Sequence, residues 1–190
     1  MTAIALLRHG HTAWNREGRL QGRTDIELDP QAIADLSDLC LPMEWRDADI
    51  VSSPLKRAVQ TAECIAQTPT TDPRLTEMDW GEWEGAHGRH LRADPSSGYL
   101  DIENWGWEYR PPGGESVSEP RTRVMDWVLA VRRRSVVVCH IGVMRVLLAE
   151  ATGWAFNGPA PFAIKRNRLY VLETNSRLFW DGTPVRLVKR

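Results

Sequence analysis

The chain has 190 residues and a formal net charge of −1, with 42% hydrophobic and 26% charged residues. This length and composition suit one globular domain, and a charge near zero gives no overall field that would attract nucleic acid or an anionic membrane. No stretch approaches the roughly 18 apolar residues of a membrane span, and the first apolar run, about five residues, is too short for a signal peptide. Cys40, Cys64 and Cys139 are widely separated, so we expect buried free thiols and a cytoplasmic location.

Strand and helix patterns alternate through the first part of the chain. Residues 3–7 predict an apolar strand, and Asp29-Pro30 is typical of an N-cap followed by the first residue of a helix. Residues 49–52 predict a second strand, Ser53-Pro54 opens a second helix, and residues 70–76 suit a further short strand. The expected apolar faces contain Ile33, Leu36 and Cys40 in the first helix, and Leu55, Ala58, Val59, Ala62, Ile65 and Ala66 in the second.

The second part begins with a segment of different character, residues 86–115. It is rich in glycine, proline and aromatic residues and lacks regular periodicity, so we expect an insertion that forms a lid. The capping box Ser116-x-x-Glu119 then opens a helix, residues 135–139 predict a buried parallel strand, and another helix follows His140. The apolar residues expected in these two helices are Val124, Trp127, Val128 and Val131, then Val143, Val146, Leu147 and Leu148.

The C-terminal part, residues 169–188, contains two β-rich runs around turn signals at Asn175-Ser176 and Asp181-Gly182. We expect these runs to add antiparallel strands to the sheet. The whole pattern predicts an α/β fold, a three-layer α/β/α sandwich with a mostly parallel sheet. It predicts one domain over residues 1–190, with the lid insertion at 86–115.

Two histidines each come directly after a predicted apolar strand. His9, next to Arg8, follows the first strand, and His140 follows the strand at 135–139. Ligands of α/β sheets bind at the carboxyl ends of strands, and the helix after His140 offers free backbone N–H groups to an anion. Arg57, in the first turn of a helix, also comes just after a strand. These four side chains would converge on one tetrahedral anion, where an imidazole can act as nucleophile or base.

Five sequence blocks extend this constellation over nearly the whole chain. They are Arg8-His9-Gly10 with Thr12-Ala13-Trp14-Asn15-x-x-Gly18-Arg19-x-Gln21-Gly22, Ser52-Ser53-Pro54-Leu55-x-Arg57-Ala58-x-Gln60-Thr61-Ala62, Glu77-x-x-Trp80-Gly81-x-Trp83-Glu84-Gly85, Gly113-Gly114-Glu115-Ser116, and Val138-Cys139-His140-x-Gly142-Val143-x-Arg145. In this order they resemble the histidine phosphatase superfamily, also called phosphoglycerate-mutase-like. Arg-His-Gly alone is not specific, whereas five blocks in the family's order are a strong signal.

The resemblance implies a mechanism for these residues. His9 would attack phosphorus and become phosphohistidine, and Glu77 would protonate the leaving oxygen and then activate water. Two guanidinium groups near His9 would disfavour its protonation. The groups implied to bind the phosphoryl oxygens are Arg8, Asn15, Arg57, His140 and the backbone N–H of Ile141. The resemblance implies no metal and no cofactor.

Three features of the motifs leave alternatives at single positions. Sequence chemistry alone does not choose the acid among three nearby glutamates, Glu77, Glu82 and Glu84, and only the motif register selects Glu77. His11 stands where the family usually has glutamate, and we expect a structural or neutral substitution rather than a role at the pocket entrance. Ile141 replaces a common glycine but keeps the backbone N–H that would bind phosphate.

Two further groups have competing interpretations. His87-x-x-His90 has the helical spacing of metal ligands, but no cysteine or carboxylate cluster completes such a set, so we expect a solvent-facing pair. The aromatic run from Trp105 to Tyr109 could stack on the organic part of a substrate or pack the lid against the domain.

The sequence therefore predicts a metal-independent phosphomonoesterase that acts on a small phosphorylated metabolite. It could be similar to α-ribazole phosphatase or have broad specificity. The alternative within the superfamily is a phosphoglycerate mutase, although such mutases carry longer insertions. Two hypotheses from other classes are a metal-dependent hydrolase that uses His9 and His11 as ligands, and a catalytically silent phosphate-binding protein. Physiological substrate and oligomeric state are not predicted.

Overall fold

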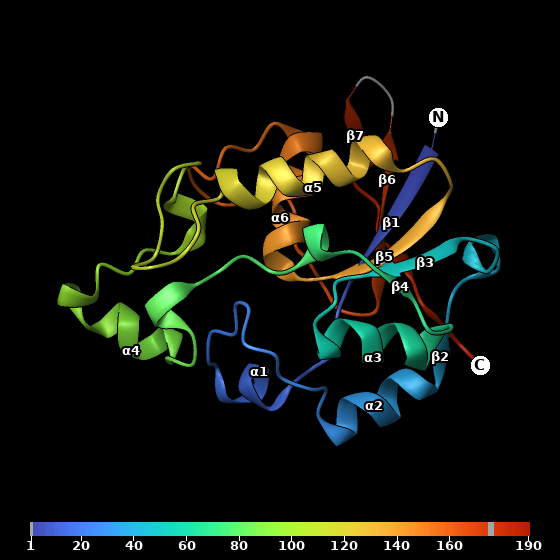
Figure 1. Ribbon diagram of the computed structural model, residues 1–190, viewed down its shortest axis with the longest axis horizontal. Helices are drawn as coiled ribbons and strands as arrows, with labels where there is room; N and C mark the ends of the chain where they lie inside the picture. The colour runs from blue at the N-terminus through green and yellow to red at the C-terminus, as the bar shows by residue number, and fades with distance from the viewer. Residues whose placement is uncertain (1, 175–176) are drawn as a thin grey trace.

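The apolar runs of the sequence lie side by side in one central sheet (Figure 1). The computed structural model describes residues 2–174 and 177–190. The turn predicted at Asn175-Ser176 lies outside the described residues. The strands are β1 (Thr2–Arg8), β2 (Leu39–Cys40), β3 (Asp49–Ser52), β4 (Thr70–Thr71), β5 (Ser135–Cys139), β6 (Arg168–Thr174), β7 (Leu178–Trp180), β8 (Val185–Arg186) and β9 (Val188–Lys189). The α-helices are α1 (Ala13–Glu17), α2 (Pro30–Ser37), α3 (Lys56–Ile65), α4 (Gly88–Ala93), α5 (Ser118–Ala130) and α6 (Ile141–Thr152). Short 3₁₀ helices are η1 (Met43–Trp45), η2 (Pro73–Leu75), η3 (Gly81–Trp83), η4 (Pro95–Ser97) and η5 (Ile102–Asn104).

Helices cover both faces of the sheet, as the continuous apolar pattern of the inner strands requires. In β1, Ala5 and Leu7 pack into one apolar cluster with α2 and α3. The intervening residues, Ile4 and Leu6, pack into a second cluster with α5 and α6. Figure 1 shows these two pairs of helices on opposite sides of the sheet. The predicted three-layer sandwich is confirmed.

The strand order places two of the chemically important strands next to each other. The main sheet runs β4-β3-β5-β1-β6-β7, and β8 pairs with β6. β1 is parallel to β5, with Arg8 opposite Cys139, and antiparallel to β6. His9 and His140 therefore leave the sheet at the same edge, and the His9 N–H donates to the Cys139 carbonyl at 3.0 Å. The predicted parallel core and antiparallel C-terminal addition are both confirmed.

Three helix boundaries and faces differ from the sequence prediction. Asp29 caps α2 as expected, but the helix ends at Ser37, and Cys40 belongs to β2, which pairs with β9. Ile33 is 39% exposed, and Ala32 takes its place in the core. α3 begins at Lys56 rather than after Ser53, because the chain is still extended at Leu55.

The start of α5 is also later than its sequence motif predicts. Val117 occupies the cap position, and Glu119 accepts hydrogen bonds from the Ser116 N–H at 2.7 Å and from the Ser116 hydroxyl at 3.1 Å. Only one half of the predicted capping box is therefore formed. Val131 follows the helix rather than lying within it.

Smaller corrections concern residues 70–76 and the cysteines. Only Thr70 and Thr71 of the first segment form a strand, and η2 follows. All three cysteines are free, but only Cys139 is buried, whereas Cys40 and Cys64 are partly exposed. No helix in residues 2–174 and 177–190 is both long and apolar enough to span a membrane.

The predicted insertion, residues 86–115, projects from one end of the sandwich and contains α4, η4 and η5 (Figure 1). Its aromatic residues pack against the domain. The ring centroid of Trp105 lies 5.2 Å from that of Trp80 and 6.2 Å from that of Trp83. Trp107 meets Phe156 edge to face at 5.2 Å. Packing therefore explains these two tryptophans.

Candidate active site

His9 lies at the end of β1 with only 3% of its surface exposed. Its Nδ1 is 2.6 Å from the carbonyl oxygen of Gly10. A carbonyl only accepts hydrogen bonds, so Nδ1 carries the proton and Nε2 keeps its lone pair in the neutral ring. His9 also lines a cavity of about 170 Å³. The local backbone thus selects the tautomer that a nucleophile needs.

Electrostatics keep this imidazole neutral. The pKa of His9 is well below its ordinary value of 6.5, first because of burial and then because of the charges of Arg57, Arg8 and Arg166. The hydrogen bond to Gly10 opposes the shift without overcoming it. Near neutral pH the His9 ring is therefore neutral, with its single proton on Nδ1.

Three arginines, Arg8, Arg19 and Arg57, line the same cavity, and the structure holds Arg57 and Arg8 in different ways. Arg57, which is 1% exposed, donates from Nη1 to Thr24 O at 2.8 Å and from Nη2 to Gly22 O at 2.7 Å. Arg8 has a buried Nε with no hydrogen-bond partner among the described residues, and burial lowers its pKa to about 10. Arg57 is thus fixed by the protein, whereas Arg8 has donors available for an anion.

His140 lies beside His9 but is not among the residues that line the cavity. The two ring centroids are 5.2 Å apart, and His140 is fully buried. Arg57 Nε donates to His140 Nδ1 at 3.3 Å, which leaves the proton on Nε2, and Nε2 donates to Ser53 Oγ at 2.7 Å. Burial and then Arg57 hold the pKa of His140 well below its ordinary value. Its direct contacts here are with Arg57 and Ser53.

Glu77 is the one of the three candidate glutamates that lines the cavity. Its side chain is 5% exposed, and it accepts hydrogen bonds from the Met78 N–H at 2.9 Å and from the Gly142 N–H at 3.1 Å. Glu84 instead accepts from the backbone of Arg23 and Thr24, in the loop whose carbonyls bind Arg57. Glu82 is exposed.

Asn15 and Ile141 also line the cavity. Asn15 Oδ1 accepts from Thr12 N–H at 3.1 Å and from Arg166 Nη2 at 2.9 Å, so its amide nitrogen has hydrogens available for another acceptor. Ile141 is the first residue of α6, and the helix supplies no partner for its backbone N–H. Arg166 also donates to His9 O at 3.1 Å.

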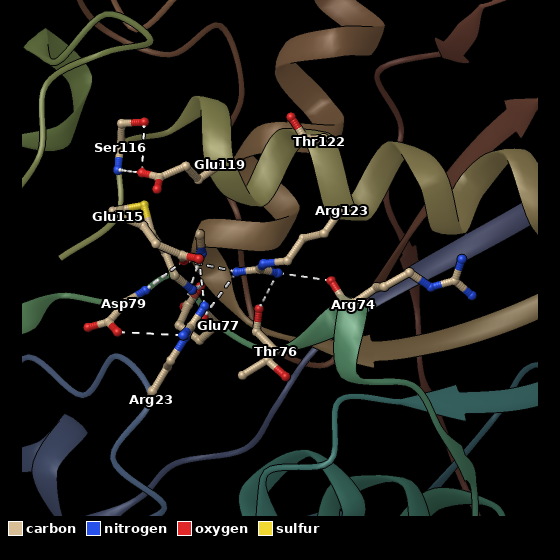
Figure 2. Close-up of polar contacts among 12 residues, drawn as sticks. Arg23, Arg74, Thr76, Glu77, Asp79, Glu115, Ser116, Glu119, Thr122 and Arg123 are labelled. Carbon is tan, nitrogen blue, oxygen red and sulfur yellow. Dashed lines mark hydrogen bonds and ion pairs between the residues drawn. The ribbon is translucent and has the colours of Figure 1, made fainter.

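A cluster of four charged residues, Arg23, Asp79, Glu115 and Arg123, holds the segment that carries Glu77 (Figure 2). Arg123 on α5 donates to the carbonyls of Arg74 and Thr76 at 2.9 and 2.7 Å, and to that of Glu77 at 3.3 Å. We call this group the Glu115 cluster, because Glu115 accepts from Arg123 at 3.2 Å, from Arg23 at 2.5 Å and from Asp79 N–H at 3.0 Å.

The structure therefore brings most predicted residues to one cavity. Arg8, His9, Asn15, Arg57, Glu77 and Ile141 line it, and His140 contacts it through Arg57. His11 lies elsewhere, in a neighbouring hollow with Arg166. His87 and His90 pair with each other at 5.0 Å near the surface. Among the described residues, no group of three or more histidine, cysteine or carboxylate side chains is arranged to hold a metal ion.

Four contributors were missed by sequence reasoning: Ser53, Arg123, Glu115 and Arg166. Ser53 and Glu115 lie within the five sequence blocks that resemble the family, and the sequence contains no other indication of their roles. Arg166 precedes β6, and the antiparallel pairing of β6 with β1 brings it to the carboxyl end of β1. That contact follows from topology and from no local motif.

Comparison with known proteins shows the family of the chain. The sequence model of the histidine phosphatase superfamily, branch 1, matches residues 4–180. The chain belongs to this superfamily.

Individual superfamily members are similar over most of their length. The chain is 32% identical over 167 residues to metal-independent phosphoserine phosphatase from Arabidopsis thaliana, covering 80% of this chain and 69% of that protein. It is 33% identical over 175 residues to glucosyl-3-phosphoglycerate phosphatase from Mycolicibacterium vanbaalenii, and the match covers 79% of this chain and 74% of that protein. A crystal structure of phosphoglycerate mutase from Thermus thermophilus has a TM-score of 0.77 and 30% identity, with full coverage of both chains.

Proposed function

We propose that the protein is a phosphomonoesterase that transfers the phosphoryl group of a small phosphorylated metabolite to His9 and then to water. The observation that carries this proposal is the unprotonated Nε2 of His9, fixed by the Nδ1 hydrogen bond to Gly10, in a cavity with Arg8 and Arg57. The similarity to two proteins named as phosphatases supports the same reaction.

The reaction has two balanced steps. His9 Nε2 forms a bond to phosphorus while the bond from phosphorus to the alcohol oxygen breaks, and protonated Glu77 gives its proton to that oxygen. Water then attacks phosphohistidine, Glu77 takes a proton from the water, and the N–P bond breaks to release phosphate. His9 returns to its neutral form, and Glu77 is again protonated.

The remaining cavity residues stabilise the charge of the phosphoryl oxygens. Arg8 and the backbone N–H of Ile141 have free donors, and Asn15 presents its amide nitrogen. Arg57 adds charge from a fixed position. His140 joins this group in our proposal by turning its Nε2–H from Ser53 to a phosphoryl oxygen, while its contact with Arg57 orients the guanidinium.

A second candidate function is phosphoglycerate mutase, favoured by the similarity to the Thermus structure. The two functions differ in the fate of the phosphoryl group. Phosphorus NMR with 3-phosphoglycerate distinguishes them, because a mutase gives 2-phosphoglycerate without net phosphate release and a phosphatase gives inorganic phosphate. We expect phosphate release to dominate.

The main test measures phosphate release from p-nitrophenyl phosphate and from a panel of phosphorylated metabolites that includes α-ribazole phosphate. His9→Ala should lower kcat by at least about 1,000-fold. His90→Ala, at an exposed histidine, serves as the matched control and should retain wild-type activity. Rapid quenching of wild type should trap acid-labile, base-stable phosphate on His9.

Two outcomes would favour other functions. Loss of activity in EDTA would support a metal-dependent hydrolase that uses His9 and His11. Absence of vanadate-sensitive phosphate release from every compound would support a silent phosphate-binding protein.

We further propose that residues 1–190 act as one domain with residues 86–115 as its lid, and that the three free cysteines suit a cytoplasmic location.

A further inference from the structure

A second, larger cavity adjoins the one that contains His9. Its volume is about 420 Å³, and it shares Leu20, Trp80 and Ile141 with the His9 cavity. The opposite wall comes from the insertion, with Tyr99 and the segment Asp101–Asn104. If phosphate occupies the first cavity, this outer cavity receives the alcohol part of the substrate.

Arg145 is the unusual residue of this outer cavity. It lies on α6 five positions after His140, is partly buried, and forms no hydrogen bond or ion pair with the residues that the structure describes. A guanidinium carries five N–H donors, and leaving them unused in a partly dehydrated place is costly. Burial lowers the pKa of Arg145, and Glu77 and Glu103 only partly oppose the shift. Arg8 shows the same lack of partners in the His9 cavity.

The other charges of the outer cavity are arranged differently. Arg92 pairs with Asp101 at 2.5 Å and lies over the Tyr99 ring at 5.4 Å, so these two charges neutralise each other. Glu103 is the remaining carboxylate in the wall. Of the two arginines that line this cavity, Arg145 is therefore the one without a paired carboxylate among the described residues, and its donors are available for a ligand. A guanidinium binds carboxylate and phosphate by paired hydrogen bonds.

We propose that Arg145 binds a second anionic group carried by the alcohol part of the substrate, and that it thereby selects phosphomonoesters of anionic alcohols. This inference rests on the proposed phosphomonoesterase function. The second group is a carboxylate or another phosphate, which share the geometry that Arg145 recognises. Leu20, Trp80 and Ile141 supply the apolar contacts for the carbon skeleton between the two anionic groups.

The test compares matched ligands as competitive inhibitors of p-nitrophenyl phosphate hydrolysis, so it does not depend on their own turnover. 3-Phosphoglycerate and glycerol 3-phosphate share a three-carbon skeleton and differ in the carboxylate. Fructose 1,6-bisphosphate and fructose 6-phosphate differ in a second phosphate. Wild type should bind the more anionic member of at least one pair about 10- to 100-fold more tightly. The pair that shows the preference identifies the second group.

Variants assign that preference to Arg145. Arg145→Gln should reduce the ratio of inhibition constants to about one, and Arg145→Lys should keep part of it, since charge remains without the planar donors. Arg121→Gln is the control, because Arg121 pairs with Glu150 on the outside of α5 and should leave the ratio unchanged. Melting temperatures verify that each variant is folded.

Three results separate the possible failures. In the first, the wild-type protein hydrolyses p-nitrophenyl phosphate and yet binds both members of each ligand pair equally tightly. That result overturns this inference and leaves the proposed function intact. A preference that persists in folded Arg145→Gln also overturns it. Wild type that releases phosphate from no compound overturns the proposed function, and this inference with it.

Discussion

The carboxylate of Glu77 accepts a hydrogen bond from the backbone N–H of Gly142 at 3.1 Å, across 65 positions of sequence. Position 142 has no room for a side chain, because a Cβ there would overlap Glu77 Oε1 and lie 3.2 Å from the Glu77 Cδ. Glycine at the second position of α6 thus allows the acid to rest against the helix N-terminus, next to the cavity.

Gly142→Ala should therefore impair catalysis more than folding. We expect kcat for alkyl phosphates to fall about 10- to 100-fold, because a displaced Glu77 no longer protonates the leaving oxygen. The free energy of unfolding should change by less than about 1 kcal/mol, since the helical preference of alanine offsets part of the overlap. Steady-state kinetics and urea unfolding measure the two effects.

p-Nitrophenyl phosphate provides the internal control for this variant, because its leaving group needs little protonation. Its hydrolysis should fall less than that of alkyl phosphates. Glu77→Gln should give the same pattern with a larger effect. Equal losses on both substrate types would contradict the role of Glu77 as acid.

The Glu115 cluster predicts a positioning role for Arg123, which holds the backbone of Glu77 without contacting the cavity. Arg123→Lys keeps the charge but cannot donate to three carbonyls and Glu115 together. We expect kcat for alkyl phosphates to fall about tenfold, with a smaller effect on p-nitrophenyl phosphate.

A double-mutant comparison separates positioning from general destabilisation. In the Glu77→Gln background, Arg123→Lys should have little further effect on kcat, because the proton donor is already absent. Multiplicative losses in the double variant would show that Arg123 acts independently of Glu77. The exposed arginine substitution Arg121→Lys is a suitable control.

Much of the candidate active site could be predicted from the sequence, because its residues lie where apolar strands end and such strands are visible in the sequence. His9, Arg57 and His140 each follow an apolar strand, and adjacent parallel strands bring their ends together. The prediction of Glu77 depended on motif register, since nothing in the local chemistry separates it from Glu82 and Glu84. Only the fold shows that Glu84 faces the loop at 22–24.

Other features depended on contacts that no local pattern contains. Cys40 leaves the predicted helix because β2 pairs with β9, with Leu39 opposite Lys189 near the end of the chain. Arg166 reaches His9 only through the pairing of β6 with β1. The engagement of His140 with Ser53 depends on side-chain rotamers, which motif order does not specify.

Stability should depend on pH through the two buried histidines. Folding lowers the pKa of His9 and His140 below their ordinary value of 6.5, so the unfolded state binds more protons at mildly acidic pH. The free energy of unfolding is then fully retained above pH 6.5 and decreases as pH falls below it, by up to about 1.4 kcal/mol per pH unit for each histidine. The paired carboxyl groups Asp29 and Glu119 contribute only nearer their ordinary pKa values of 3.8 and 4.5.

Urea unfolding between pH 5 and pH 8 measures this slope. His9→Asn and His140→Asn should each flatten the decrease below pH 6.5, and the double variant should flatten it further. A wild-type slope of zero in this window would show that the histidines are not buried in neutral form.

Arg166 should contribute to anion binding although it does not line the cavity that holds His9. It donates to His9 O and to Asn15 Oδ1, and burial together with the neighbouring Arg8 lowers its pKa to about 9, so it stays charged at neutral pH. Arg166→Met frees the Asn15 amide to turn away and removes one positive charge beside the phosphate site. We expect the inhibition constants of orthovanadate and inorganic phosphate to rise about tenfold. His11→Gln, in the same hollow but without a contact to Asn15, is the control, and unchanged inhibition of folded Arg166→Met would refute the role.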